Sequence, residues 1–96
     1  MQAHINGTFI LKHKGRFYKV LKVEHNVGSR FAFECKDIET KQSQVLQFEM
    51  SGLLEALDSA ASVMKDSKDI LLMDLDNQGK WQIMTKDQID KATKRH

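Results

Sequence analysis

Apolar and polar residues alternate along four short segments in the first half of the chain, and polar or glycine-containing turns separate these segments. The segments are Thr8–His13, Arg16–His25, Arg30–Asp37 and Gln42–Met50. Alternation with a period of two is typical of strands that bury one face. The pattern therefore predicts an antiparallel, four-stranded meander over Thr8–Met50.

The first turn determines how the first two strands pair. A two-residue loop at Lys14-Gly15 places Leu11 opposite Tyr18. Because lysine disfavours a positive φ, a bulged turn that shifts the register by one residue is the alternative. We favour the two-residue loop because the later turns continue its register.

The second and third turns place the large side chains on one face of the meander. The second turn pairs Val20 with Cys35, and the third pairs Phe33 with Leu46. Apolar pairs across neighbouring strands stabilise a sheet. The resulting apolar face consists of Phe9, Leu11, Tyr18, Val20, Phe31, Phe33, Cys35, Leu46, Phe48 and Met50.

The opposite face of the meander, which we call the mixed face, combines lysines with apolar residues. It consists of Ile10, Lys12, Phe17, Lys19, Leu21, Val23, Ala32, Glu34, Val45 and Gln47. A sheet face that is open to water is usually more polar than this. Either the sheet curls into an SH3-like partial barrel, or the C-terminal part of the chain or another subunit covers the mixed face.

The residues after the meander predict one principal helix and a second hairpin. Leucine, alanine and methionine return at helical spacing over Gly52–Asp66, with Ser51 as the N-cap. The apolar stripe of this helix is expected to cover the apolar face. Ile70–Asp76 and Lys80–Met84 read as two strands around a turn at Asn77-Gln78-Gly79.

A short helix is expected to end the chain. Thr85 followed three residues later by Gln88 matches a capping box, which predicts a helix over Lys86–Lys94. Ile89 and Ala92 are its clear candidates for burial. The predicted fold is therefore α+β: a single domain over residues 1–96, with a four-stranded meander, a second hairpin, one main helix on the sheet and a short C-terminal helix.

Composition narrows the class of protein only a little. A chain of 96 residues that is 41% hydrophobic can build one core without disulfides or a metal. A single cysteine excludes an intramolecular disulfide, and no apolar run approaches the roughly 18 residues that a membrane span needs. The first residues also lack the charged-then-apolar profile of a signal peptide. We expect a cytoplasmic protein without a membrane partner.

Charge is unevenly distributed along the chain, although the net charge is only +2. Residues 1–30 contain six Lys or Arg and one Glu, residues 31–79 contain four basic and ten acidic groups, and residues 80–96 contain five basic and two acidic groups. A basic first hairpin and a basic tail thus flank an acidic middle. Such asymmetry is typical of a protein with an anionic partner, and it also arises when charges only solvate a small surface.

The basic first hairpin is the candidate nucleic-acid site. Cations that neutralise phosphates, together with an aromatic ring that stacks on bases, are how small β modules hold single strands. The candidate residues are Lys12, Lys14, Arg16, Phe17, Lys19 and Lys22. The expected partner is RNA or single-stranded DNA; the alternative is that these lysines only keep the hairpin solvated.

The second hypothesis is a protein-interaction or homodimerising module that buries the mixed face. The candidate interface residues are Ile10, Phe17, Leu21, Val23 and Val45. The partner would be a second copy of the chain or another protein. A small protein of a phage or other mobile element is one setting for such a module.

No residue pattern indicates an enzyme, a cofactor or a metal site. Asp74–Gly79 is similar to the start of a calcium loop, but Thr85 at the twelfth position cannot supply the bidentate carboxylate. His4 and His25 face each other in the predicted register, yet no third ligand accompanies them. Cys35 lies on the apolar face without a nearby cation to lower its pKa, so it is expected to be unreactive.

Turn and strand motifs recur in a particular order over about residues 7–48. They are Gly15-Arg16-Phe17-Tyr18-Lys19-Val20-Leu21-Lys22-Val23-Glu24-His25, Gly28, Phe31-Ala32-Phe33, and Asp37 to Thr40-Lys41. This order resembles the N-terminal SH3-like barrel of bacterial elongation factor P, which implies a small-barrel topology and RNA binding. That family carries a basic residue, often a modified lysine, at the tip of the loop after Val-Glu-His. Here that loop is Asn-Val-Gly-Ser with only Arg30 nearby, so the resemblance does not imply the translation role.

Overall fold

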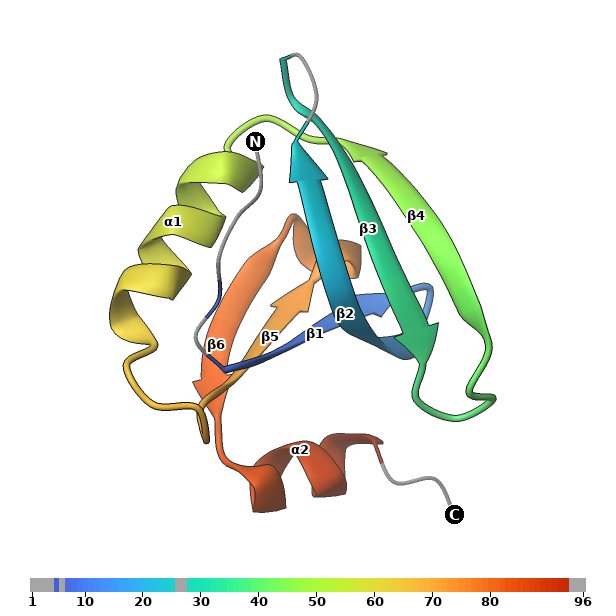
Figure 1. Ribbon diagram of the computed structural model, residues 1–96, viewed down its shortest axis with the longest axis vertical. Helices are drawn as coiled ribbons and strands as arrows, with labels where there is room; N and C mark the ends of the chain where they lie inside the picture. The colour runs from blue at the N-terminus through green and yellow to red at the C-terminus, as the bar shows by residue number, and fades with distance from the viewer. Residues whose placement is uncertain (1–4, 6, 26–27, 94–96) are drawn as a thin grey trace.

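One mixed six-stranded sheet organises the chain, and a helix packs on each of its faces (Figure 1). The computed structural model describes residues 5, 7–25 and 28–93. The elements in chain order are β1 (Thr8–His13), β2 (Arg16–His25), β3 (Arg30–Asp37), β4 (Ser43–Glu49), α1 (Leu53–Val63), β5 (Ile70–Asp74), the 3₁₀ turn η1 (Leu75–Asn77), β6 (Lys80–Met84) and α2 (Lys86–Thr93). The strand order is β4-β3-β2-β1-β5-β6, and every neighbouring pair is antiparallel except β1–β5, which is parallel.

The α+β class is confirmed, but the sheet is larger than predicted and open. It has six strands rather than four and does not close into a barrel. The reason is β5, which takes the side of β1 that β2 leaves free and makes β4 and β6 the two edges. Residues 70–73 are all buried, as is typical of a strand that is covered on both faces.

The predicted register is confirmed at the first and third turns, whereas next to the second turn β2 and β3 pair one residue out of the predicted register. The pairs Leu11–Tyr18, Val20–Cys35 and Phe33–Leu46 are all present. Every residue predicted for the apolar face lies in, or packs against, a single core cluster, together with the apolar stripe of α1. Period-two patterning and turn chemistry together therefore placed this face correctly.

The first turn is the two-residue loop, in which both central residues have positive φ. Lys14 has a φ of 52° and Gly15 a φ of 74°, as a type I′ turn requires. The left-handed region is unfavourable for lysine, but the Asp76 carboxylate in η1 accepts hydrogen bonds from the backbone N–H groups of Lys14 (2.7 Å) and Gly15 (3.0 Å). These hydrogen bonds, the one from Gly15 foremost, lower the pKa of the Asp76 carboxyl. Asp76 in the turn between β5 and β6 thus links the β1–β2 hairpin to the β5–β6 hairpin.

A β-bulge in β2 changes the predicted face of one residue. The pairing shifts after Val20, so Leu21 is the extra residue and Val23 lies opposite Phe33. Val23 is therefore buried in the main core with 5% exposure, and its predicted place on the mixed face is wrong. Leu21 is 57% exposed. Figure 1 shows that β2 curves strongly. As a result, β3 and β4 run across the direction of β1 and β5.

The helix α1 covers the apolar face, as predicted, but it is shorter than the predicted Gly52–Asp66. Its buried residues, Leu53, Leu57 and Ala60, recur at helical spacing. The predicted cap at Ser51 is wrong, because Gly52 is the N-cap and makes no side-chain cap hydrogen bond. Gly52 has a φ of 81°, a conformation that glycine adopts without a steric penalty, and this turn starts the helix one residue later than a serine cap would.

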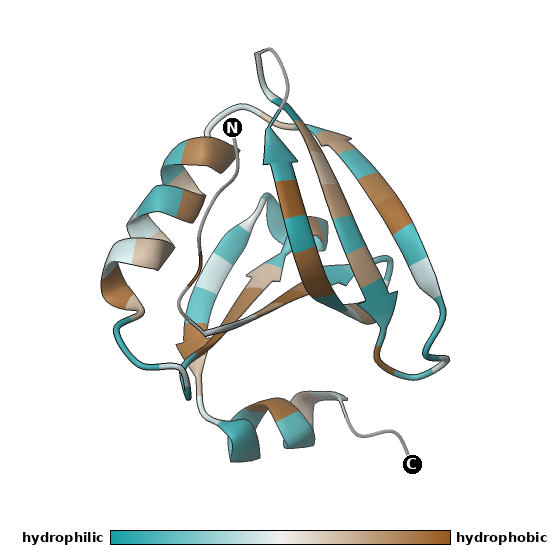
Figure 2. Cartoon of the chain, viewed as in Figure 1, coloured by the Kyte–Doolittle hydropathy of each residue, from teal (hydrophilic) through white to brown (hydrophobic). Residues whose placement is uncertain are grey.

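The helix α2 covers one end of the mixed face. Its start is the predicted capping box: the Thr85 N–H donates to the Gln88 side chain at 2.9 Å, and the Gln88 N–H donates to the Thr85 hydroxyl at 3.2 Å. Ile89 is its one buried residue within the described part, and Figure 2 shows the matching short apolar band between hydrophilic turns. Ile89 joins a second, smaller cluster with Ile10, Ile70 and Leu72. The predicted last residue of this helix, Lys94, lies outside the described residues.

Candidate nucleic-acid interface

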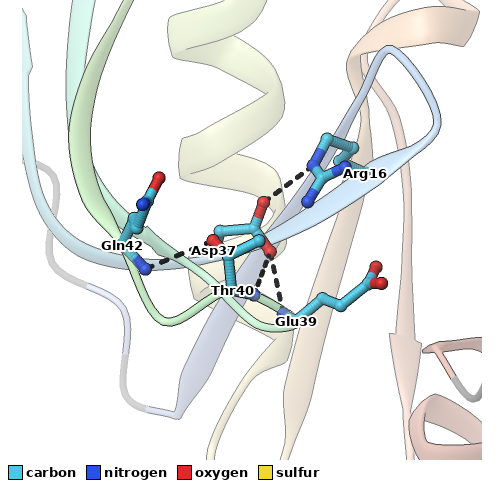
Figure 3. Close-up of polar contacts among 5 residues, drawn as sticks. All are labelled: Arg16, Asp37, Glu39, Thr40 and Gln42. Carbon is cyan, nitrogen blue, oxygen red and sulfur yellow. Dashed lines mark hydrogen bonds and ion pairs between the residues drawn. The ribbon is translucent and has the colours of Figure 1, made fainter.

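Arg16, a predicted phosphate ligand, is held in a polar network beside the turn of the first hairpin. Its Nε donates to Asp37 Oδ2 at 2.8 Å, while Asp37 Oδ1 accepts from the N–H groups of Glu39 (2.8 Å) and Thr40 (3.1 Å) (Figure 3). The Thr40 hydroxyl accepts in turn from the Gln42 N–H at 3.3 Å. Burial raises the pKa of the Asp37 carboxyl, but the hydrogen bonds from Arg16 and the two N–H groups outweigh it, so the pKa lies below its usual value. The Arg16 guanidinium therefore neutralises the buried carboxylate of Asp37.

Lys22 is also neutralised locally. Its Nζ lies 2.9 Å from Glu24 Oε1, and the two side chains are about equally exposed. The hydrogen bond from Lys22 lowers the pKa of Glu24 and raises that of Lys22. This end of β2 consequently presents a dipole to the solvent and adds little net positive charge.

Three further lysines lie on the mixed face, and we call Lys12, Lys19 and Lys36 the lysine patch. Lys19 of β2 lies directly opposite Lys36 of β3, and both are exposed. Lys12 of β1 lies opposite Phe17, two residues from Lys19 on the same face of the hairpin. No lysine of the patch forms a salt bridge with any described residue. Lys12 faces Asp74 of β5 on its other side, whereas Lys19 and Lys36 face each other.

Phe17 is more enclosed than a stacking platform would be. It packs against the small cluster beneath α2, and Lys12 Nζ lies 5.9 Å from the centroid of its ring. Beside it is a hollow of about 370 Å³ that Asp37, Glu39 and Thr93 also line. The ring therefore holds Lys12 in place through a cation–π contact, and any contact that it makes with a base is limited to its exposed part.

Lys14 lies exposed at the tip of the hairpin, and only its backbone N–H is engaged by Asp76. Lys36 was absent from the predicted site. A signal for it existed, because the predicted pairing of Val20 with Cys35 already places Lys36 opposite Lys19. The predicted site was confined to the first hairpin and therefore omitted Lys36 of β3.

The predicted interface residues are divided between the core and the surface. Ile10 is 5% exposed beneath α2, so the chain's own C-terminal helix covers this part of the mixed face. Val23 is in the main core, and Phe17 is partly buried. Leu21 and Val45 remain, with 57% and 58% exposure.

The described residues contain no cluster of three or more His, Cys, Asp or Glu that could hold a metal ion. The predicted pairing of His4 with His25 involves His4, which lies outside the described residues. The carboxylates of Asp74 and Asp76 both accept backbone N–H groups within the turns. Cys35 is a free, buried thiol whose pKa is raised by burial.

Of the helices in the described ranges, neither combines the length and the apolar character needed to cross a membrane.

Comparison of the chain with models of known families, with curated proteins and with solved structures finds no match. The resemblance to the N-terminal barrel of elongation factor P therefore stays a prediction.

Proposed function

We propose that this protein binds single-stranded nucleic acid, RNA or DNA, through the lysine patch, with Lys14 at the edge of the site. The observation that carries the proposal is the pair Lys19–Lys36. Like charges directly opposite each other on neighbouring strands destabilise a sheet, and neither lysine of this pair forms a salt bridge with a described residue. A phosphate between the two ammonium groups would remove their repulsion.

The shape of the site favours an extended single strand. The patch follows the open surface of β2 and β3 beside α2, and the aromatic ring nearest to it is Phe17, which already contacts Lys12. Binding would therefore depend mainly on phosphates, with weak preference for sequence. Arg16 and Lys22 of the originally predicted set serve intramolecular ion pairs instead.

The test is fluorescence anisotropy of labelled single-stranded RNA and DNA with the full chain over a salt series. Four phosphate contacts, by Lys12, Lys14, Lys19 and Lys36, predict a slope of about −3 for log K against log salt concentration. The double variant Lys19→Gln/Lys36→Gln should reduce the magnitude of that slope by about 1.4. It should also weaken binding at low salt at least about tenfold.

The matched control is Lys65→Gln/Lys68→Gln, which removes the same charge from the exposed segment after α1. It should bind like the parent chain. Absence of binding at low salt, or an equal loss in both double variants, would contradict the proposal. Arg16 is left intact, because its replacement would leave the buried Asp37 carboxylate without a cation.

The second candidate is a protein-interaction module, and the exposed side chains of Leu21 and Val45 favour it. These two residues alone form a small apolar surface. The candidate therefore depends on the backbone that carries Val45, which is the edge strand β4.

A further inference from the structure

We infer that β4 is a self-complementary edge through which two copies of this chain pair, joining their sheets into one. The inference is independent of nucleic-acid binding. It begins with topology: β4 has β3 on one side only, and Figure 1 shows no helix beside its other side.

The hydrogen-bond phase of β4 identifies the backbone groups that face outward. The Met50 N–H donates to the Ser29 carbonyl at 3.0 Å, and the Asp37 N–H donates to the Gln42 carbonyl at 2.9 Å. Hydrogen-bonded pairs alternate along an antiparallel ladder, so the even-numbered residues of β4 bond to β3. The backbone N–H and C=O groups of the odd-numbered residues point to the open edge; these residues are Ser43, Val45, Gln47 and Glu49.

This edge lacks the features that usually prevent edge-to-edge pairing. Natural edge strands carry lysines, prolines, bulges or a covering segment. β4 has seven residues, one of them charged, Glu49 at its end, and it pairs with β3 without a register shift. The other edge, β6, is shorter at five residues and begins with Lys80. An unprotected edge of this length is a template for another strand.

The occupant is a second copy because one register satisfies every outward group. Antiparallel pairing about a two-fold axis at Leu46 sets Val45 opposite Gln47 of the second copy, and Ser43 opposite Glu49 of the second copy. These pairs supply roughly eight inter-chain hydrogen bonds. Leu46, half-buried on the apolar face, meets the same residue across the axis. Val45, one of the most exposed apolar side chains, is partly covered.

Charge supports the same register. Lys36 lies opposite Ser43 within the chain, and Arg30 lies opposite Glu49. The paired edges therefore form the cross-sheet row Lys36, Ser43, then Glu49 and Arg30 of the second copy, so that a carboxylate approaches the lysine patch. A register that brought the two Glu49 residues together would instead place like charges face to face.

Sedimentation equilibrium of the full chain over a broad concentration range tests the pairing. One chain has a mass of 11.1 kDa, and the mean mass should rise towards twice that value at high micromolar concentration. The edge contact is small beside a typical interface of about 1,600 Å², so the dissociation constant should be micromolar. A monomer throughout the range would overturn the inference.

The Gln47→Pro variant separates this edge from any other surface. It removes an outward N–H without breaking the ladder to β3, a position where edge strands tolerate proline. It should raise the dissociation constant at least about tenfold, whereas Gln47→Thr, which keeps the N–H, should dimerise like the parent chain. A folded Gln47→Pro variant that still dimerises would overturn the inference.

A cysteine pair gives a second measurement that does not depend on proline. With Leu46 at the two-fold axis, Leu46→Cys should form a disulfide-linked dimer under mild oxidation, because opposed residues in a non-hydrogen-bonded pair have Cα atoms about 4.5 Å apart. Gln44→Cys, opposite Phe48 of the second copy, should cross-link far less. The native Cys35 is buried and supplies no competing link. Equal cross-linking of both variants, or of neither, would overturn the inference.

Discussion

Asp37 is the side chain that links the turn end of the first hairpin to the β3–β4 turn. It is a carboxylate with 5% exposure that accepts three hydrogen bonds, from Arg16 Nε and from the N–H groups of Glu39 and Thr40. The Ile38 N–H next to it donates to the Phe17 carbonyl at 3.0 Å. One acid thus ties the β3–β4 turn to the start of β2.

Replacement of Asp37 by Asn should destabilise the fold. The amide can present only one acceptor oxygen, so it loses either Arg16 or the turn, and its own N–H₂ group opposes a donor. The free energy of unfolding should fall by about 2 kcal/mol in urea denaturation. The control Asp58→Asn removes the same charge from an exposed position on α1 and should change stability little. Equal stability of the two variants would show that the network contributes nothing.

Acid should weaken the fold in a defined range of pH. The pKa of Asp37 and that of Asp76 are lowered in the folded chain, so the folded state holds protons less tightly than the unfolded state. Stability from these groups is complete above their ordinary pKa of about 4 and is lost as the pH falls through the lower folded values. Urea midpoints between about pH 6 and pH 2.5 measure the loss, and Asp37→Asn should show a shallower decline. A parallel decline would contradict the assignment to Asp37.

Most individual assignments could be made from the sequence because they rest on local rules. Period-two alternation and turn chemistry placed the apolar face correctly, and the Thr85–Gln88 capping box is present as predicted. The ion pair of Arg16 could not be read in the same way, because it depends on Asp37, at the end of β3, being buried beside it. The ion pair of Lys22 with Glu24 could have been read, because residues two apart in a strand share a face.

The bulge in β2 is the element-level feature that sequence patterning missed. Leu21 and Val23 are both apolar and lie two residues apart, so alternation alone places them on the same face. Packing decides between them: the extra residue at Leu21 lets Val23 enter the core beside Phe33. A bulge increases the bend of a strand, and β2 curves strongly (Figure 1).

Alanine substitutions should separate these two residues. Val23→Ala removes buried methyl groups and should lower the free energy of unfolding by about 2 kcal/mol. Leu21→Ala removes an exposed side chain and should change it by less than about 0.5 kcal/mol. Urea denaturation of both variants measures the difference. If Leu21→Ala lowered the free energy of unfolding more than Val23→Ala, the bulged pairing would be contradicted and Val23 would belong to the mixed face.

The parallel pairing of β1 with β5 gives the whole molecule its architecture. No single turn joins these strands, since β2, β3, β4 and α1 lie between them in the chain, and local turn chemistry therefore cannot reveal the pairing. The pairing also explains why the meander is not a barrel. β1 is an interior strand, and the surfaces that complete the core come from α1 and β5.

A chain of residues 1–51 should consequently not fold. It keeps the whole stretch that resembles the elongation factor P barrel, but it lacks Leu53, Leu57, Leu71 and Met73, all buried in the main core. Circular dichroism should show no cooperative thermal transition for this fragment, and the full chain should show one. A cooperative transition in the fragment would support an autonomous barrel and count against the open sheet.

The late position of β5 has a consequence for biosynthesis. The first four strands leave the ribosome before α1 and β5, so for several seconds at about 10 residues per second the nascent meander displays its phenylalanines without a cover. The parallel side of β1 also stays unpaired until residue 74 has emerged. We expect the nascent chain to depend on protection until β5 has emerged and can pair with β1.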